Sequence, residues 1–203
     1  MQHRQPVELP AQQSAALEAA YASPPRAYHD FGHVEEVLRH YAAVAAGPGW
    51  SQPAEVYLAV LYHDAIYVAG RRDNEACSAH LAREHLARWL PQAGIDADRI
   101  AGLIELTARH GRVGPGDVDR DAALFLDCDM AILGAAPAQF DAYDRGIAAE
   151  YRGQVPAWTY KLNRRRFLKS LLARERIYLT DFFHARCDAQ ARINLRRAVT
   201  EKR

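Results

Sequence analysis

The sequence has almost none of the signals that mark β-sheets, disulfide frameworks or membrane segments. Alternation of apolar and polar residues is nearly absent, so no β-sheet is expected. The three cysteines are odd in number and include no Cys-x-x-Cys pair, which argues against a disulfide framework and favours a reducing compartment. The N-terminal residues carry no apolar signal core, and no apolar run reaches the length of a membrane span. The cytoplasm is therefore the expected location, with no membrane partner.

A large excess of charge of either sign is also missing. Lysine and arginine number 26 against 25 acidic residues, which leaves a net charge of +1. This balance offers no general electrostatic reason to bind nucleic acid, and no nucleic-acid partner is expected. One basic run, residues 161–168, could contact phosphate or nucleic acid. Its alternation with apolar residues at helical spacing favours a solvated amphipathic face instead.

Helical periodicity is abundant, with capping residues, prolines and glycines at the expected helix ends. The sequence predicts an all-α bundle with short connections, and its 203 residues fit a single domain over residues 1–203. Asp181 is expected to cap a long last helix. The expected helices cover about residues 10–22, 32–46, 53–64, 74–90, 97–109, 119–133 and 137–152, with two more that begin at residues 156 and 181.

His63 and Asp64 end one of the most apolar stretches of the chain, residues 56–62. A helix that is apolar nearly all round is expected to be buried, and burying a carboxylate beside an imidazole costs several kcal/mol unless they are paired. A divalent metal ion is a suitable partner, because neutral imidazole and carboxylate both ligate it. His33 upstream and Asp129 downstream complete an H…HD…D order on separate predicted helices. The sequence therefore predicts a metal site formed by these four residues.

The ends of the predicted helices decide whether these side chains can meet. Neighbouring residues on a helix point about 100° apart, so His63 and Asp64 converge on one ion only where the helix end loosens. The stretch that follows, residues 65–68, contains β-branched residues and permits this loosening. Two nitrogen and two oxygen ligands leave coordination positions for water and substrate, which is typical of a catalytic metal.

Three segments of the chain resemble the HD-domain superfamily of metal-dependent phosphohydrolases, which is named after its His-Asp pair. Residues 28–38 (YHDFGHVEEVL) resemble the helix that carries the first ligand, and residues 61–65 (LYHDA) resemble the second motif. Residues 126–134 (LDCDMAILG) resemble the helix with the last aspartate. The chain is most similar to the bacterial proteins described as predicted HD phosphohydrolases. The resemblance implies an HD-domain-like helical bundle with a motif core over about residues 27–134, followed by C-terminal helices over residues 135–203.

Carried over by position, the resemblance implies that His33, His63, Asp64 and Asp129 bind the metal. The two-metal relatives often add histidines after the His-Asp pair, and the pair in this chain, His63 and Asp64, begins no HDxxH. One divalent ion, drawn from Mn, Fe, Co, Ni, Zn or Mg, is therefore expected, and a second stays open. His29 is matched to the proton donor of the cyclic-nucleotide phosphodiesterase relatives. Asp64 or His29 would handle protons, so these two are the expected catalytic residues.

Two assignments stay open. Asp127 and Asp129 are two residues apart and point to nearly opposite faces of a helix. Residues 128–130 match the superfamily pattern better than residues 126–128, and Asp127 could then orient a ligand histidine. His110 is the best candidate ligand for a second metal. A histidine at a helix end is equally expected from its favourable interaction with the helix dipole.

The leading function is a hydrolase that acts on a phosphate ester or anhydride, such as that of a small nucleotide, through a water activated by the metal. The alternative is a non-catalytic nucleotide-sensing or scaffold protein that uses the same site to bind ligand. A third interpretation is a structural bundle in which the histidines and aspartates only hydrogen-bond to one another. A homodimer is a reasonable expectation for the assembly. Five arginines in or beside the loops near the motifs could bind the phosphate of a substrate: Arg26, Arg71, Arg72, Arg109 and Arg112.

Overall fold

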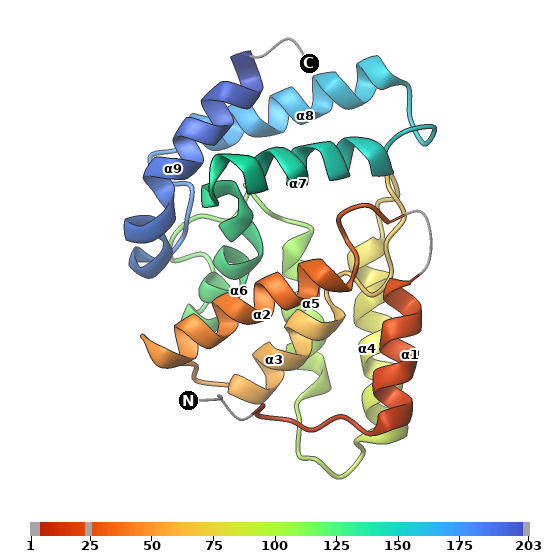
Figure 1. Cartoon of the computed structure of the whole chain (residues 1–203). Coiled ribbons are helices and arrows are strands. Elements are labelled where there is room, and N and C mark those ends of the chain that lie inside the picture. The colour runs from red at the N-terminus through yellow and green to blue at the C-terminus, as the bar shows by residue number, and fades with distance from the viewer. Residues whose placement is uncertain (1–4, 23–25, 201–203) are drawn as a thin grey trace. The chain divides into compact units, whose positions relative to one another are not determined.

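The computed structural model describes residues 5–22 and 26–200, and this part of the chain is built of helices (Figure 1). No β-strand occurs among these residues, so the all-α prediction is confirmed. The helix positions agree with those expected from the sequence to within a few residues at each end. The helices are α1 (Ala11–Tyr21), α2 (Phe31–Ala46), α3 (Pro53–Tyr62), α4 (Asn74–Trp89), α5 (Ala97–Thr107), α6 (Arg120–Met130), the 3-10 helix η1 (Ala131–Gly134), α7 (Pro137–Glu150), α8 (Ala157–Leu172) and α9 (Asp181–Thr200).

The chain divides after Arg109 into two compact units. The first unit holds α1 to α5, and the second holds α6 to α9 together with η1. The motif core expected over about residues 27–134 therefore draws its segments from both units. The single-domain organisation stays a prediction.

Within residues 5–22 and 26–200, no individual helix is long and apolar enough to span a membrane. The helices Arg120–Gly134 and Pro137–Glu150 reach that length and composition only when taken together, and they are bent by 104° at the break between them.

The core of the first unit is built around α3. Every residue from Val56 to Tyr62 is buried, as expected for a helix that is apolar nearly all round. α3 packs against α2, α4 and α5 (Figure 1). The α1 helix is tied to it by the amide of Gln13, which donates to the Tyr62 hydroxyl at 2.9 Å. The C-terminal end of α3 is therefore held in place from several sides.

Aspartates begin three of the helices in the way that the sequence suggests. The side chains of Asp30, Asp96 and Asp119 accept hydrogen bonds from backbone amides in the first turns of α2, α5 and α6. The expected cap of the last helix is wrong by one residue. Asp181 is the first residue of α9, and the hydroxyl of Thr180 accepts from the Phe183 amide at 3.4 Å.

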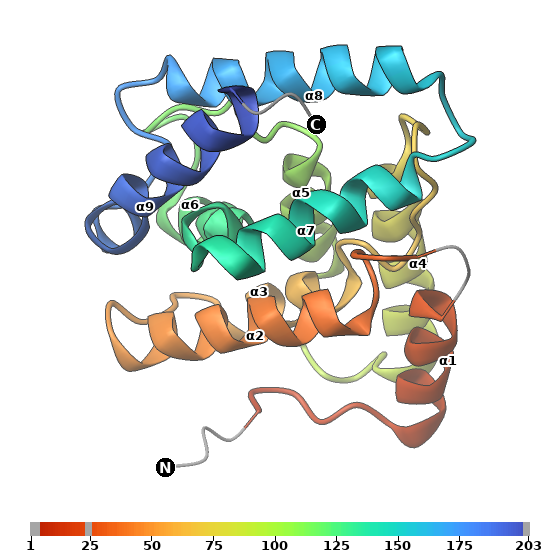
Figure 2. The same ribbon diagram turned by 45° about the horizontal axis from the view of Figure 1, so that its top comes forward.

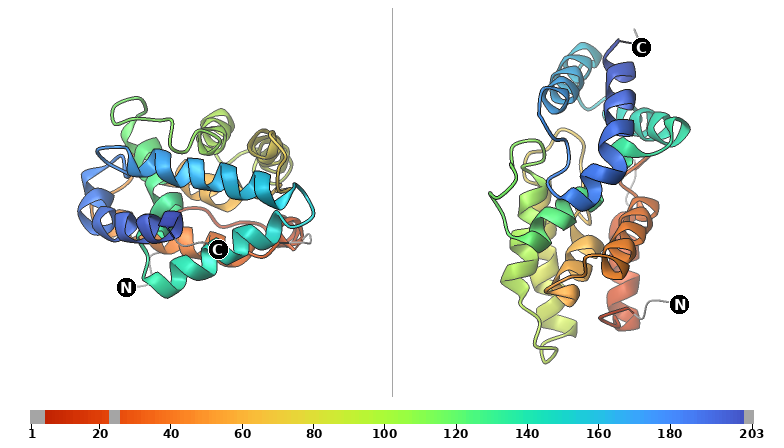
Figure 3. Two further views of the ribbon diagram at one scale, coloured as in Figure 1. Left: turned by 90° about the horizontal axis from the view of Figure 1, so that it is seen from above. Right: turned by 90° about the vertical axis from the view of Figure 1, so that its left-hand side faces the viewer.

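In the second unit, η1 continues α6 and packs against α7 and α9. α8 also packs against α9, and the three long helices of this unit are visible together in Figure 2 and in the left panel of Figure 3. The buried side chain of Asn194 on α9 donates to the carbonyls of Leu133 and Ala135, both at 2.9 Å. These two hydrogen bonds satisfy carbonyls that lie at the end of the 3-10 helix.

The contact between η1 and α9 leaves no room for a side chain at position 134. A Cβ atom added to Gly134 would lie 2.7 Å from Cβ of Cys187 and 2.8 Å from its carbonyl oxygen. We expect Gly134→Ala to lower the free energy of unfolding by roughly 1–3 kcal/mol, because backbone must move to relieve the overlap. Chemical denaturation followed by circular dichroism measures this change.

The matched control is Gly102→Ala in the middle of α5, where an added Cβ meets nothing within 4 Å. This substitution should stabilise the chain by about 0.5–1 kcal/mol, because alanine is the better helix former. Equal effects at the two positions would contradict the close packing of η1 on α9.

Asp188 ties the start of α9 to the loop before it. Its carboxylate accepts from the Ile177 amide at 2.8 Å and from Arg192 Nε at 2.6 Å. Burial opposes ionisation of this carboxyl, but the Ile177 amide and Arg192 outweigh it and hold the pKa of Asp188 below its ordinary value.

Asp188→Asn should therefore destabilise the chain by roughly 1–3 kcal/mol at neutral pH, since a charge-assisted bond is lost. A depressed folded-state pKa means that the contribution is fully present above about pH 4, the unfolded value, and is lost as the pH falls through the folded value. Denaturant titrations of both proteins at several pH values should converge on acidification. A constant difference down to the lowest pH would count against the lowered pKa.

Candidate metal centre

The end of α3 brings His63 and Asp64 to one point in the first unit. The helix stops at Tyr62, and His63 follows with helical torsion angles while its amide donates to the Ala59 carbonyl at 2.9 Å. Asp64 then lies in a turn. Because the regular helix has ended, the two side chains converge, and His63 Nε2 lies 3.2 Å from Asp64 Oδ2.

His33 supplies the third group of the cluster. It is the third residue of α2, the helix that Asp30 caps, and its side chain is buried. His33 Nε2 lies 3.1 Å from His63 Nε2 and 3.6 Å from Asp64 Oδ2. The structure thus brings together three of the four predicted ligands, with all ligand atoms within 4.8 Å of one another. We call these three residues the His–Asp cluster.

The spacing of the His–Asp cluster fits a shared divalent ion. Nitrogen and carboxylate ligands lie about 2.0–2.2 Å from zinc-like ions, so two ligand atoms on one ion are separated by roughly 3.0–3.5 Å. The three separations in the cluster, 3.1, 3.2 and 3.6 Å, are close to that range. A cation would also balance the carboxylate that is held in this largely buried place.

The tautomer of His63 favours metal binding as well. Its Nδ1 lies 2.9 Å from the Val60 carbonyl oxygen, which can only accept, so Nδ1 carries the proton and donates. In the neutral ring Nε2 then bears a lone pair, and it is Nε2 that faces His33 and Asp64. A backbone carbonyl that orients a histidine in this way is typical of metal ligands.

Asp64 is ionised in this environment. Burial alone would raise the pKa of its carboxyl, but positive charge on the neighbouring imidazoles of His63, His29 and His33 in the metal-free protein outweighs burial and lowers the pKa below its ordinary value. The carboxylate side chain remains partly open to solvent, with 14% of its surface exposed. The cluster therefore brings a negative oxygen and two imidazole nitrogens together, with Asp64 as its partly exposed member.

His29 lies beside the cluster rather than within it. Its Nε2 is 4.0 Å from Asp64 Oδ2, and its ring stacks on Tyr67 with centroids 3.9 Å apart. The side chain is 16% exposed, so it can reach solvent or a bound molecule. This position is compatible with the proton donor that the sequence suggests.

Sequence reasoning missed the residues that hold the loops around the cluster. Arg26 donates to the carbonyls of His29 and Asp64 at 2.8 Å and of Ala65 at 2.9 Å. The Tyr21 hydroxyl donates to the Leu61 carbonyl and accepts from the Asp64 amide. Arg26 thus joins the residues before α2 to the residues after α3, and Tyr21 joins α1 to the end of α3. The partners lie far apart in the sequence, so only the structure reveals these contacts.

Two polar residues on α4 clamp the loop that follows Asp64. Asn74 exchanges two hydrogen bonds with the backbone of Val68, both at 3.0 Å. Ser78 accepts from the Ile66 amide at 3.0 Å and donates to its carbonyl at 3.2 Å. Asn74 and Ser78 are four residues apart, so they lie on one face of α4, and both are buried. Two polar residues at this spacing were the feature of the sequence that could have indicated their role.

The arginines expected to bind phosphate are placed differently from one another. Arg26 is engaged with backbone carbonyls, as described above, and Arg71 pairs with Asp73. Arg72, Arg109 and Arg112 are exposed. Of the five, Arg72 therefore keeps an exposed position in the loop that follows the His–Asp cluster.

The fourth predicted ligand, Asp129, belongs to the second unit. Its Oδ2 lies 2.6 Å from Nε2 of His110, the residue singled out for a second metal. Both side chains are partly buried, at 13% and 18% exposed. The pairing of these two candidates is a finding, whereas their role as metal ligands stays a prediction.

Asp127 is engaged elsewhere in the second unit. Oδ1 accepts from the Leu179 amide at 2.8 Å, and Oδ2 accepts from the amide and the hydroxyl of Thr180 at 2.8 and 2.7 Å. Burial raises the pKa of Asp127 to about 6 against the lowering effect of these donors. The suggestion that Asp127 orients a ligand histidine is replaced by a structural role, which is to hold the segment before α9.

Comparison with known proteins found no match: no family model, no curated protein and no solved structure matches this chain. The resemblance to the HD-domain superfamily rests on the three segments named above and stays a prediction. The cluster of His33, His63 and Asp64 is the geometric observation on which a function can be built.

Proposed function

We propose that the chain is a metal-dependent phosphohydrolase that acts on a phosphate ester or anhydride, with a small nucleotide as the leading substrate. The observation that carries this proposal is the convergence of His33 Nε2, His63 Nε2 and Asp64 Oδ2 at separations of 3.1–3.6 Å. A purely structural cluster would not need two imidazole nitrogens and a carboxylate oxygen aimed at one partly open point.

His33, His63 and Asp64 would hold the ion, and Asp129 stays a ligand expected from the sequence alone. A bound divalent cation would supply charge neutralisation at the phosphoryl oxygens and make a water molecule more acidic. The Val60 carbonyl keeps His63 in the tautomer that leaves Nε2 available. Asn74 and Ser78 keep the loop after Asp64 in one conformation, so the ligands do not have to be ordered when the ion binds.

Proton transfer falls to groups at the edge of the cluster. The ionised Asp64 can accept a proton from a water molecule nearby. His29, stacked on Tyr67 and 4.0 Å from Asp64, can donate a proton to a leaving oxygen. Arg72 in the exposed loop is the residue we assign to a phosphoryl oxygen, because its guanidinium can bind two oxygens at once.

The test combines metal content with hydrolysis. Purified protein should contain a transition metal near one equivalent per chain by elemental analysis, and should hydrolyse bis-p-nitrophenyl phosphate or nucleotides when Mn²⁺ is added. Removal of the metal with EDTA should lower the melting temperature, because an ion bound only by the folded chain stabilises it.

Each outcome decides between the functions. If the protein contains metal but hydrolyses no phosphate ester, the hydrolase proposal is replaced by that of a sensor that binds metal and ligand. A chain that takes up no divalent metal and shows no change with EDTA would overturn the proposal and leave a hydrogen-bonded structural cluster.

A further inference from the structure

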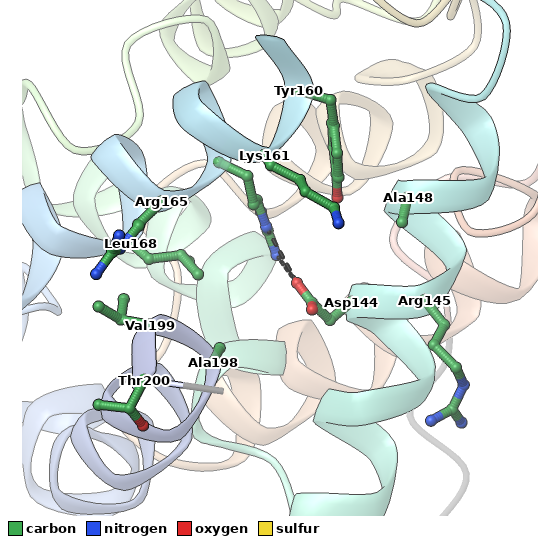
Figure 4. Close-up of a pocket in the computed structure, with 11 residues that line it drawn as sticks. Asp144, Arg145, Ala148, Tyr160, Lys161, Arg165, Leu168, Ala198, Val199 and Thr200 are labelled. Carbon is green, nitrogen blue, oxygen red and sulfur yellow. Dashed lines mark hydrogen bonds and ion pairs between the residues drawn. The ribbon is translucent and has the colours of Figure 1, made fainter. Parts of the chain in front are cut away.

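The second unit contains a cavity of about 520 Å³ that shares no residue with the His–Asp cluster. It lies where α7, α8 and the end of α9 meet (Figure 4). Small-molecule sites in proteins occupy about 300–1,000 Å³, so this cavity has the size of a binding site. It is larger than the space needed for single water molecules.

Positive charge gathers around this cavity. Of the described residues that line it, Arg145 on α7 and Lys161, Arg164 and Arg165 on α8 are cations, and Asp144 is the single carboxylate. Four cations and one anion leave an excess of three positive charges around one small space. The chain as a whole carries only +1, so the charge is concentrated here locally.

The single carboxylate is already occupied. Arg164 donates to Asp144 Oδ1 through Nε at 3.1 Å and through Nη2 at 3.0 Å. The guanidinium of Arg164 also lies over the ring of Tyr143, 4.9 Å from its centroid. Both partners are largely buried, so this pair forms a fixed wall of the cavity without net charge rather than a mobile surface contact.

The remaining cations have no acidic partner. Among residues 5–22 and 26–200, Lys161 and Arg165 take part in no ion pair, and both are exposed. In Figure 4 Lys161 runs alongside Tyr160 toward Ala148, and Arg165 lies on the other side near Leu168. Arg145 extends away from the other labelled side chains and belongs to the rim. An anion in the cavity would therefore meet Lys161 and Arg165.

Apolar surface forms the rest of the lining. Ala148, Leu168, Ala198 and Val199 contribute side chains, and Tyr160 adds an aromatic ring. Burial raises the pKa of Tyr160 to about 12, so its hydroxyl is neutral at physiological pH and can donate a hydrogen bond. The cavity thus combines cations for a charged group with a surface that an apolar body would cover.

We propose that this cavity is a second ligand site, which binds a phosphorylated small molecule with an apolar or aromatic body. Lys161 on one side and Arg165 on the other supply the positive charge that attracts the phosphate, and the apolar lining with Tyr160 holds the body. The positive charge and the apolar lining together favour this class, because an inorganic anion would not cover the apolar lining and a neutral compound would not pair with the cations. The proposal goes beyond the hydrolase and does not depend on it.

The test uses titration calorimetry with 1-naphthyl phosphate as the probe, in the presence of EDTA. The chelator removes divalent metal, so binding at the His–Asp cluster through an ion cannot contribute. One molecule should bind per chain. Inorganic phosphate and 1-naphthol, which each lack one half of the probe, should bind at least about tenfold more weakly.

Two double variants separate the cavity from general basicity of α8. Lys161→Ala with Arg165→Ala should weaken binding at least about tenfold, because both cavity cations are lost. Arg166→Ala with Lys169→Ala removes the same charge from exposed positions that do not line the cavity, and should change the affinity less than about twofold. Both pairs lie on the surface of α8, so the fold should survive, which circular dichroism checks.

A third variant tests the apolar half. Ala148→Phe should fill part of the cavity and lower the affinity for 1-naphthyl phosphate without any change in charge. If the two double variants lose affinity for the probe equally, the probe is held only by general attraction to a basic helix, and the proposal is overturned. Failure of 1-naphthyl phosphate to saturate, or equal affinity for inorganic phosphate, would overturn it as well. None of these results bears on metal binding or hydrolysis, so the two proposals fail separately.

Discussion

Replacing His63 with alanine should lower the affinity for divalent metal by at least about 100-fold and reduce metal-dependent phosphate hydrolysis by about 1,000-fold or more. His63 contributes the lone pair of Nε2, and its ring is held by the Val60 carbonyl in the only tautomer that can offer it. Metal titration and initial rates with bis-p-nitrophenyl phosphate measure the two effects.

The side chain of His63 is completely buried, so its removal also leaves a void that could disturb the fold. Asp64→Asn keeps the size of the side chain while removing the charge, and it should lose metal and activity in the same way. The matched control is His80→Ala, because His80 is an exposed histidine on α4 that faces Glu84. Wild-type metal content in both cluster variants would show that the cluster does not bind the ion.

Asp127 and Asp129 should respond to alanine substitution in opposite ways. Asp127→Ala leaves three donors without their acceptor, namely the amides of Leu179 and Thr180 and the Thr180 hydroxyl. Orphaned buried donors cost about 1–3 kcal/mol each, but the ionised Asp127 is itself costly to bury. We expect a net loss of roughly 2–4 kcal/mol in the free energy of unfolding.

Asp129→Ala should destabilise the metal-free protein less than Asp127→Ala does, since Asp129 and its partner His110 are both partly exposed whereas Asp127 is buried. Metal content and hydrolysis should fall in this variant if Asp129 is the fourth ligand. Denaturation in EDTA and elemental analysis separate the two roles. The opposite pattern, with a stable Asp127→Ala protein that has lost its metal, would exchange the assignments of the two aspartates.

The helices could be predicted because their signals are local. Apolar residues at helical spacing, aspartates at helix starts, and prolines and glycines at helix ends act within a few residues of one another. The burial of α3 followed from its apolar composition on every face. The cap of α9 was placed one residue late, because Asp181 and Thr180 are both good capping residues and the sequence does not rank them.

The candidate site was predictable only in part. His63 and Asp64 converge because α3 ends at Tyr62, and an apolar run that ends in a polar pair was a readable signal. Arg26 and Tyr21 were not predicted as supports of the loops, since their partners are backbone groups far along the chain. That Asp127 could orient a histidine was one of two open readings, and its donors lie some fifty residues away in sequence, beyond the reach of a local pattern.

By itself, the sequence determined the helical class, the approximate extent of each helix and the choice of candidate metal ligands, because these depend on local periodicity and on side-chain chemistry. Only the tertiary structure decided which of those residues meet. It brought His33 to His63 and Asp64, gave Asp127 to the segment before α9, and gathered the cations of α7 and α8 around one cavity. Such encounters depend on how helices pack, and packing is set by many side chains at once rather than by any single stretch of sequence.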